Sequence, residues 1–179
     1  MPADALGRIR IVLHRTSHPG NIGSAARAMK TMGLTRLVLV APKVADPAAD
    51  EEARALATGS VDVVERATIC ASLEQALEGA EVAIAFSARP RDLSHAPLDA
   101  RAAAAEAVAS AATGEVALVF GNETAGLSNH DVMLCNRLAH IPSDPRHGSL
   151  NLAAAVQVAA YELRMAADRK STTSELQSH

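Results

Sequence analysis

The sequence predicts an α/β protein built on a mostly parallel sheet of five or six strands, with helices on both faces. The first observation is that short apolar runs alternate with longer segments of helical periodicity along the chain. The second is that these runs are unbroken, as expected for strands covered on both faces. Because no internal repeat or linker interrupts the pattern, residues 1–169 are assigned to one domain and residues 170–179 to a polar, disordered tail.

The strands are predicted from the apolar runs themselves. The predicted strands cover residues 8–14, 37–40, 61–64, 82–86, 116–120 and 138–141, and the run at 61–64 is the weakest of them. Aromatic residues make up only 2% of the 179 residues, so Ala, Val and Leu must build most of the core. Alanine-lined helices then favour close packing against the sheet.

The helices are predicted from their start and stop signals. Asn21 is a good N-cap and Gly33 a good stop, and Asp46 with the following proline has the pattern of a second helix start. Ser72 and Gln75 have the spacing of a capping box. The predicted helices cover residues 21–33, 46–57, 72–79, 99–112, 129–134 and a long apolar segment that ends near Arg169.

The charge and the cysteines exclude several classes of protein. A formal net charge of −3 argues against a general nucleic-acid coat, although it leaves room for a local basic patch. The basic residues are nearly all arginine, which suits a defined anion site and equally suits a compositional bias of the genome. Cys70 and Cys135 lie in apolar surroundings without metal-ligand spacing, so we expect reduced thiols, no metal and a cytoplasmic location. No signal peptide or apolar run of spanning length is apparent, which predicts no membrane partner.

Polar residues follow four of the predicted strands. Ligands of open α/β sheets bind at the carboxyl ends of the strands, so these four loops are expected to form one site. The residues concerned are His18, Asn21 and Arg27, then Ser87, Arg89 and Arg91, then Gly121, Asn122 and Glu123, and finally Gly148, Ser149 and Asn151.

Each of these residues also has a simpler interpretation. Ser149 and Asn151 begin a helix, where they serve either as plain N-caps or as part of a binding surface at its free N–H groups. Glu123 is either a site residue or an exposed loop acid, and Arg27 either a site residue or a surface cation. The absence of the G-x-G-x-x-G, P-loop and G-x-S-x-G patterns disfavours a Rossmann dehydrogenase, an NTPase and a serine hydrolase. A group transfer that depends on positioning suits such a site better.

Three motifs in this order resemble those of the SPOUT-class RNA 2′-O-ribose methyltransferases of the SpoU/TrmH type. They are Asn21-Ile-Gly-Ser-Ala-Ala-Arg27, Leu118-Val-Phe-Gly-Asn-Glu-Thr-Ala-Gly-Leu127, and Ile141-Pro142 through Ser149-Leu-Asn151. The resemblance covers about residues 8–165. Within the class it is strongest to the branch that methylates tRNA, on segments such as Thr16-Ser-His-Pro-Gly20.

The resemblance implies a fold feature, a cofactor and an assembly. The fold feature is a C-terminal trefoil knot across roughly residues 115–165, and the assembly is a homodimer with its site between subunits. The cofactor is the methyl donor S-adenosylmethionine, held by the knot loops. By position in the motifs, its contacts would be Phe86, Ser87, Ala88, Gly121, Ile141, Gly148, Ser149 and Leu150.

The resemblance also implies a mechanism and a substrate. Arg27 matches the catalytic arginine; because a guanidinium is not readily deprotonated, we expect it to hold the phosphate beside the target ribose. Asn21 and Glu123 would fix Arg27 and the loop geometry, and Ser149 and Asn151 would position ribose and donor. The expected substrate is tRNA, at the first nucleotide of the anticodon loop. The local basic surface would come from Arg8, Arg10, Arg15, Arg89, Arg91 and Arg146.

Three other functions remain open from the sequence. One is methylation of ribosomal RNA, and another is a non-catalytic module that binds RNA or a nucleotide on the same scaffold. The third is a nicotinamide-dependent Rossmann enzyme, which the missing glycine fingerprint disfavours.

Overall fold

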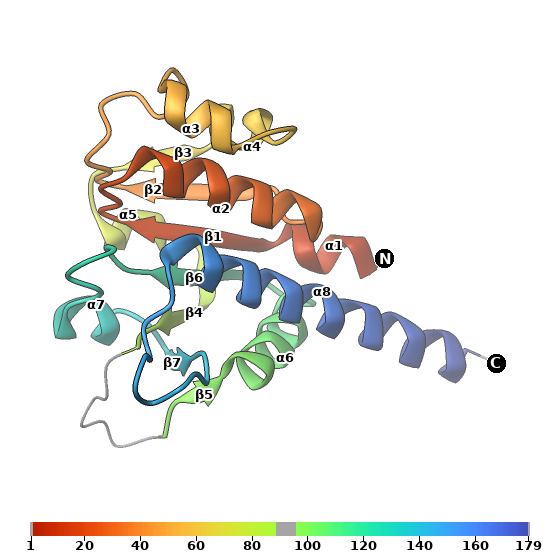
Figure 1. The fold of residues 1–179 in the computed structure, drawn as a ribbon. Helices are drawn as coiled ribbons and strands as arrows, with labels where there is room; N and C mark the ends of the chain where they lie inside the picture. The colour runs from red at the N-terminus through yellow and green to blue at the C-terminus, as the bar shows by residue number, and fades with distance from the viewer. Residues whose placement is uncertain (1, 89–95, 179) are drawn as a thin grey trace.

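A single parallel sheet organises the fold. The computed structural model describes residues 2–88 and 96–178, and within them seven strands lie in the order β3-β2-β1-β6-β4-β7-β5 (Figure 1). Every strand pair in this sheet is parallel, which confirms the predicted fold class. The predicted number of five or six strands is too low, because the two short edge strands, β3 and β5, were not predicted. The strands are β1 (Ile9–His14), β2 (Arg36–Val40), β3 (Thr68–Cys70), β4 (Ala80–Phe86), β5 (Leu98–Asp99), β6 (Glu115–Phe120) and β7 (Arg137–His140).

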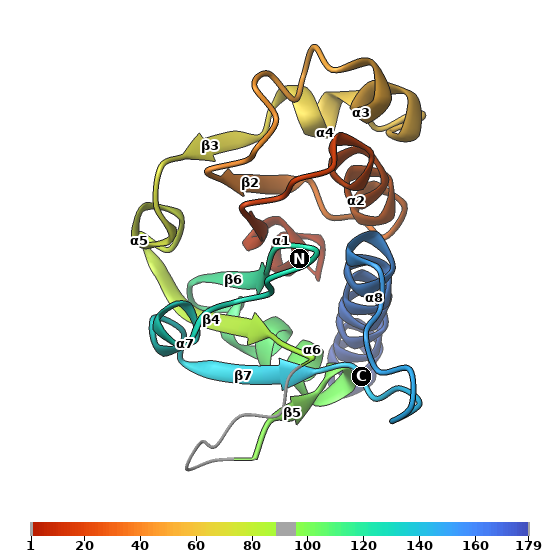
Figure 2. The same ribbon diagram turned by 60° about the vertical axis from the view of Figure 1, so that its left-hand side comes forward.

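Helices cover the two faces of the sheet unequally. Figure 2 shows α2 and α8 on one side of the sheet and the short helices α5 and α7 on the other. The helices are α1 (Pro2–Gly7), α2 (Pro19–Thr31), α3 (Glu51–Leu56), α4 (Val61–Glu65), α5 (Leu73–Ala76), α6 (Ala100–Ser110), α7 (Asn129–Met133) and α8 (Leu152–Gln177). The longer helices therefore bury the larger part of the core.

The core follows from the alternation of side chains along each strand. Ile11 of β1 points into the cluster beneath α2, α6 and α8, whereas its neighbour Val12 points into the smaller cluster with α5 and α7. On the larger face, alanines such as Ala107 of α6 and Ala159 of α8 are buried, so these helices approach the sheet and each other closely. The predicted dominance of small aliphatic residues in the core is confirmed.

One predicted strand is wrong, and one predicted helix begins later than expected. The run at 61–64 forms α4, and its buried Val63 and Val64 pack onto the core from a helix. So short an apolar run has no period that separates strand from helix. The edge strand on this side of the sheet is β3, which is largely exposed and so lacks an apolar run. The helix predicted from Asp46 is α3, which begins at Glu51, where the Asp50 carboxylate accepts from the amide of Ala53. Asp46 instead begins a turn.

The C-terminal helix is longer than expected. The sequence places its end near Arg169, followed by a disordered tail, but α8 continues through Gln177. No glycine or proline lies within α8 to stop it. The hydroxyls of Thr172 and Thr173 donate to the carbonyls of Asp168 and Arg169, which satisfies both polar side chains within the helix.

Candidate functional site

A cavity of about 410 Å³ lies at the carboxyl ends of β4 and β6. Its walls come from three segments that are far apart in the sequence: the end of β4, the loop after β6, and the segment that leads into α8. The lining residues are Phe86, Ser87, Ala88, Phe120, Gly121, Asn122, Glu123, Thr124, Gly126, Leu127, Ile141, Gly148, Ser149, Leu150, Leu152 and Ala155. This is the size range of a pocket for a small organic ligand.

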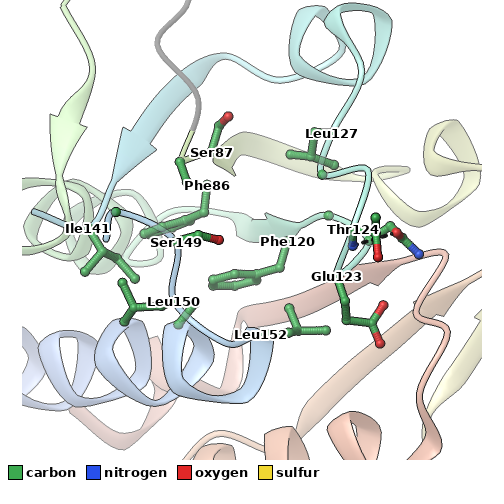
Figure 3. A pocket seen from close by; sticks show the side chains of 16 residues that line it. Phe86, Ser87, Phe120, Glu123, Thr124, Leu127, Ile141, Ser149, Leu150 and Leu152 are labelled. Carbon is green, nitrogen blue, oxygen red and sulfur yellow. Dashed lines mark hydrogen bonds between the residues drawn. The ribbon is translucent and has the colours of Figure 1, made fainter. Parts of the chain in front are cut away.

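The floor of the cavity is aromatic. The rings of Phe86 and Phe120 stack with centroids 4.8 Å apart and planes inclined by 14°. Figure 3 shows them in the middle of the lining, with Ile141 and Leu150 on one side and Glu123 on the other. Both phenylalanines are buried, so they present a fixed apolar surface.

The eight residues predicted to hold the donor all lie in this lining. They are Phe86, Ser87, Ala88, Gly121, Ile141, Gly148, Ser149 and Leu150. The cavity thus brings together three of the four loops that were assigned to one edge of the sheet, whereas the loop after β1 contributes no residue to the lining. Of the predicted catalytic residues, Glu123 and Ser149 line the cavity, whereas Asn21, Arg27 and Asn151 lie outside the lining.

The loop after β6 is tightly folded at Gly121. A Cβ at this position would overlap the carbonyl carbon of Gly126 and lie 2.6 Å from the amide nitrogen of Leu127. The amide of Gly126 donates to the carbonyl of Asn122, and Gly126 has a φ of 66°. Glycine at both positions lets the loop close on itself beside the cavity.

Glu123 ties this loop to the start of α2. Its carboxylate accepts from the amides of Ser17 (2.9 Å) and His18 (2.8 Å) and from Nδ2 of Asn21 (3.0 Å). Burial alone would raise the pKa of the Glu123 carboxyl, but the hydrogen bonds outweigh burial and hold it below its ordinary value. Glu123 is therefore a fixed anion at neutral pH and not a proton donor, and its interpretation as an exposed loop acid is wrong.

Arg27 lies on the exposed face of α2. Within the described residues no hydrogen bond or ion pair joins it to Asn21 or Glu123, which bond to each other instead. The expected support of Arg27 is therefore indirect, because these two residues fix the N-terminus of the helix that carries it. The guanidinium itself is left available to a ligand.

Asn151 is the N-cap of α8. Its Oδ1 accepts from the amides of Ala153 (2.9 Å) and Ala154 (3.3 Å), so the simpler interpretation of this residue describes its observed contacts. Ser149, two residues earlier, faces the cavity. The cap fixes the start of α8, and the two residues before it, Ser149 and Leu150, line the cavity. Asn151 therefore lies beside the cavity without lining it.

The predicted basic surface is only partly formed. Arg10 is 8% exposed and donates to the carbonyls of Ala76 and Glu78, so its assignment to an RNA surface is wrong: this arginine is needed at the end of α5. Arg8 is exposed but donates to the carbonyls at the end of α6. Arg15 is exposed, and Arg146 is exposed and paired with Asp144. Arg89 and Arg91 lie outside the described residues.

The cysteines and the acidic residues suggest no further centre. Burial and the nearby Asp131 raise the pKa of the Cys135 thiol to about 12, and burial also raises the pKa of Cys70. Both thiols are free. Among residues 2–88 and 96–178, no group of three or more His, Cys, Asp or Glu side chains could hold a metal ion. In the same part of the chain no helix is both long and apolar enough to cross a membrane.

A parallel sheet with an apolar cavity at its strand ends defines an α/β protein that binds a small ligand. A family model described as the SpoU rRNA Methylase family matches residues 8–161, so the chain belongs to this family. The chain is 54% identical over 162 residues to the tRNA (cytidine/uridine/adenosine-2′-O-)-methyltransferase TrmJ of Pseudomonas aeruginosa. The match covers 90% of this chain and 62% of that relative, so the chain spans less than two thirds of its length.

Solved structures agree with this family. A probable methyltransferase from Bordetella pertussis Tohama I is similar with a TM-score of 0.86 and 49% identity, over 92% of this chain and 99% of that chain. The SpoU methyltransferase AviRb from Streptomyces viridochromogenes, solved with the cofactor AdoMet, has a TM-score of 0.67 and 26% identity. That similarity covers 91% of this chain and 60% of AviRb.

Proposed function

We propose that this chain is the catalytic part of a methyltransferase that transfers a methyl group from S-adenosylmethionine to a ribose 2′-hydroxyl of tRNA. The observation that carries the proposal is the cavity, because every residue assigned to the donor by motif position lies in its lining. Membership of the SpoU family and 54% identity to a TrmJ enzyme support the reaction and the substrate. The proposed domain is residues 1–169, and the turns of α8 beyond it extend away from the sheet (Figure 1).

The residues of the cavity fit the donor. Stacked Phe86 and Phe120 offer an apolar floor, and the closely folded Gly121 loop offers backbone groups on one wall. Ser149 supplies a polar group at the other wall. When bound, the donor supplies an electrophilic sulfonium methyl, and AviRb, of the same family, was solved with this cofactor. These chain residues would bind the donor and exclude water from it.

Arg27 is the proposed catalytic residue. Its guanidinium is exposed on α2 and stays positively charged, so it is suited to hold a phosphate and not to accept a proton. The phosphate that Arg27 holds fixes the neighbouring ribose in place. The proton of the ribose 2′-hydroxyl passes to that phosphate or to water. Glu123 and Asn21 act by fixing the start of α2, and Asn151 by fixing the start of α8.

The substrate and the setting are proposed on the same basis. The proposed nucleotide is the first of the anticodon loop, and Arg15 supplies exposed positive charge for the RNA. Arg146 adds to this charge when its pair with Asp144 opens. Methylation of rRNA is the second candidate, because the family description names rRNA. We also propose a homodimer in the cytoplasm, with the knot across residues 115–165; the exposed Tyr161 and Met165 of α8 offer an apolar surface for the second copy.

The test is methyl transfer from labelled S-adenosylmethionine to bulk tRNA and to rRNA, with the modified nucleoside mapped. Arg27→Ala is expected to lower transfer by at least about a hundredfold while donor binding stays largely intact. Arg66→Ala, at the exposed end of α4, is the matched control and should keep full activity. Retained activity in Arg27→Ala, or lost donor binding, would overturn the role of Arg27. Label in rRNA alone would favour the second candidate.

A further inference from the structure

Asn122 connects two loops with its single side chain. Its Nδ2 donates to the carbonyl of Arg15 (2.7 Å) and to Oγ of Ser17 (2.9 Å), on the segment between β1 and α2. Its Oδ1 accepts from the amides of Thr124 and Ala125 (both 2.9 Å), within its own loop. The carboxamide therefore donates to the segment between β1 and α2 and accepts from the loop after β6.

The two loops have different tasks under the proposed function. The loop from Gly121 to Leu127 forms a wall of the donor cavity, and Asn122 itself lies in the lining. The segment around Ser17 leads into α2, whose exposed face carries Arg27. The relative position of these loops fixes where the phosphate-holding arginine lies with respect to the donor.

The contact at Arg15 holds a conformation that is unfavourable by itself. Arg15 has a φ of 60°, in the left-handed region that costs a non-glycine residue free energy. Its amide donates to the carbonyl of Val40, and its carbonyl accepts from Asn122, so both of its backbone groups are engaged. The turn at the end of β1 is thus held in part by the loop after β6.

We propose that Asn122 is a positioning residue for methyl transfer, which holds the donor loop and the start of α2 in register. This inference rests on the proposed function. Asn122 acts together with the neighbouring Glu123: the carboxylate holds Ser17 and His18 by their amides, and the carboxamide holds Arg15 and Ser17 by their acceptor groups. The simpler alternative is that Asn122 only caps its own loop through Oδ1.

Two substitutions separate these roles. Asn122→Asp keeps an oxygen for the amides of Thr124 and Ala125 but places a second oxygen against the carbonyl of Arg15. It therefore breaks the link to Arg15 and leaves only the hydroxyl of Ser17 able to bond across the loops. Asn122→Ala removes both halves. Asn136→Ala is the matched control, because the Asn136 side chain also accepts a backbone amide, that of Ala83 at 2.7 Å, but ahead of β7 and away from the cavity.

The measurements are kcat and KM for tRNA, the Kd of S-adenosylmethionine, and amide hydrogen exchange of residues 15–21. Both Asn122 variants should lower kcat roughly ten- to hundredfold. Asn122→Asp, which keeps the contacts within the donor loop, should change the Kd of the donor by less than about threefold. Exchange in residues 15–21 should become faster in both variants. Asn136→Ala should keep its kcat even if its midpoint of unfolding falls.

Three outcomes would overturn the role of Asn122. They are a wild-type kcat in Asn122→Asp, a loss of donor binding in Asn122→Asp that parallels its loss of kcat, and an equal fall of kcat in Asn136→Ala. If the wild-type chain methylates no RNA, the proposed function is what fails. Hydrogen exchange then decides the link by itself, since unchanged exchange of residues 15–21 in Asn122→Asp would exclude it.

Discussion

At Glu123 two physical effects act on one carboxyl in opposite directions. Burial raises its pKa, while hydrogen bonds from Ser17, Asn21 and His18 lower it, and the net value lies below the ordinary 4.5. A carboxyl whose pKa is depressed by folding contributes stability that is complete above its unfolded pKa. This contribution is lost as the pH falls through the lower, folded value. The contacts around Glu123 should therefore weaken in acid.

Glu123→Gln tests this sign. The amide of glutamine cannot accept on both sides, so we expect the free energy of unfolding to fall by about 1 kcal/mol at pH 7. The difference between wild type and variant should shrink as the pH drops below about 4.5, the ordinary pKa of the group. Urea denaturation at several pH values measures it. Glu65→Gln, at the exposed end of α4, serves as control. An equal difference at pH 4 and pH 7 would contradict the argument.

Single residues also show how far the sequence could predict the site. The donor loops were predictable, because the carboxyl ends of parallel strands meet at one edge of the sheet. The partners of Arg10 and Asn122 were not, because they lie 66 and 107 positions away along the chain. Phe120 could have been found: it and Phe86 are the chain's only two phenylalanines, and each ends a strand that leads into a candidate loop.

Among the elements, α2 and α3 approach each other closely at Gly23. A Cβ there would overlap the carbonyl of Ala53, which belongs to the backbone and cannot rotate away. Gly23 belongs to the first family motif, yet its surroundings give it a packing role. We expect Gly23→Ala to push α3 away and to destabilise the fold by about 1–3 kcal/mol.

The midpoint and slope of chemical denaturation measure this effect. Gly7→Ala is the matched control, because nothing lies within 4 Å of a Cβ at Gly7. That control should be neutral or slightly stabilising, since alanine favours helix. If Gly23→Ala has the stability of the wild type, α3 can move away from α2 without a loss of folding free energy, which would contradict this prediction.

The errors in predicting elements have a common physical cause. The run at 61–64 was ambiguous because its burial comes from tertiary packing of Val63 and Val64, which no local period records. The edge strand β3 was missed for the opposite reason: it is a strand with little burial. Ile69 is 58% exposed, and β3 is defined only by its pairing with β2. The central strands were predictable because a strand that is buried on both faces needs an unbroken run of apolar residues.

At the scale of the whole molecule, α8 packs on the core with one face and exposes another face to the proposed second copy. Val156, Ala160 and Leu163 of this helix are fully buried against the sheet side, whereas Tyr161 is 44% and Met165 37% exposed. The two exposed residues are one helical turn apart, so they present one apolar surface. A helix that buries one face in its own core and leaves large apolar groups on another is suited to pack against a second copy of itself.

The expected result is a wild-type chain that sediments at twice the mass of one chain, and a double variant, Tyr161→Glu with Met165→Glu, that sediments as a monomer. Two carboxylates on a shared apolar surface repel and lose hydration, so dimerisation should weaken by at least about tenfold. Met133→Glu is the control, because Met133 is 79% exposed on α7 and lies outside α8. Far-ultraviolet circular dichroism confirms that the variants fold. A monomeric wild type, or a double variant that stays dimeric, would exclude this surface. If the active site lies between subunits, the monomeric variant should also lose methyl transfer, which links the assembly to the chemistry.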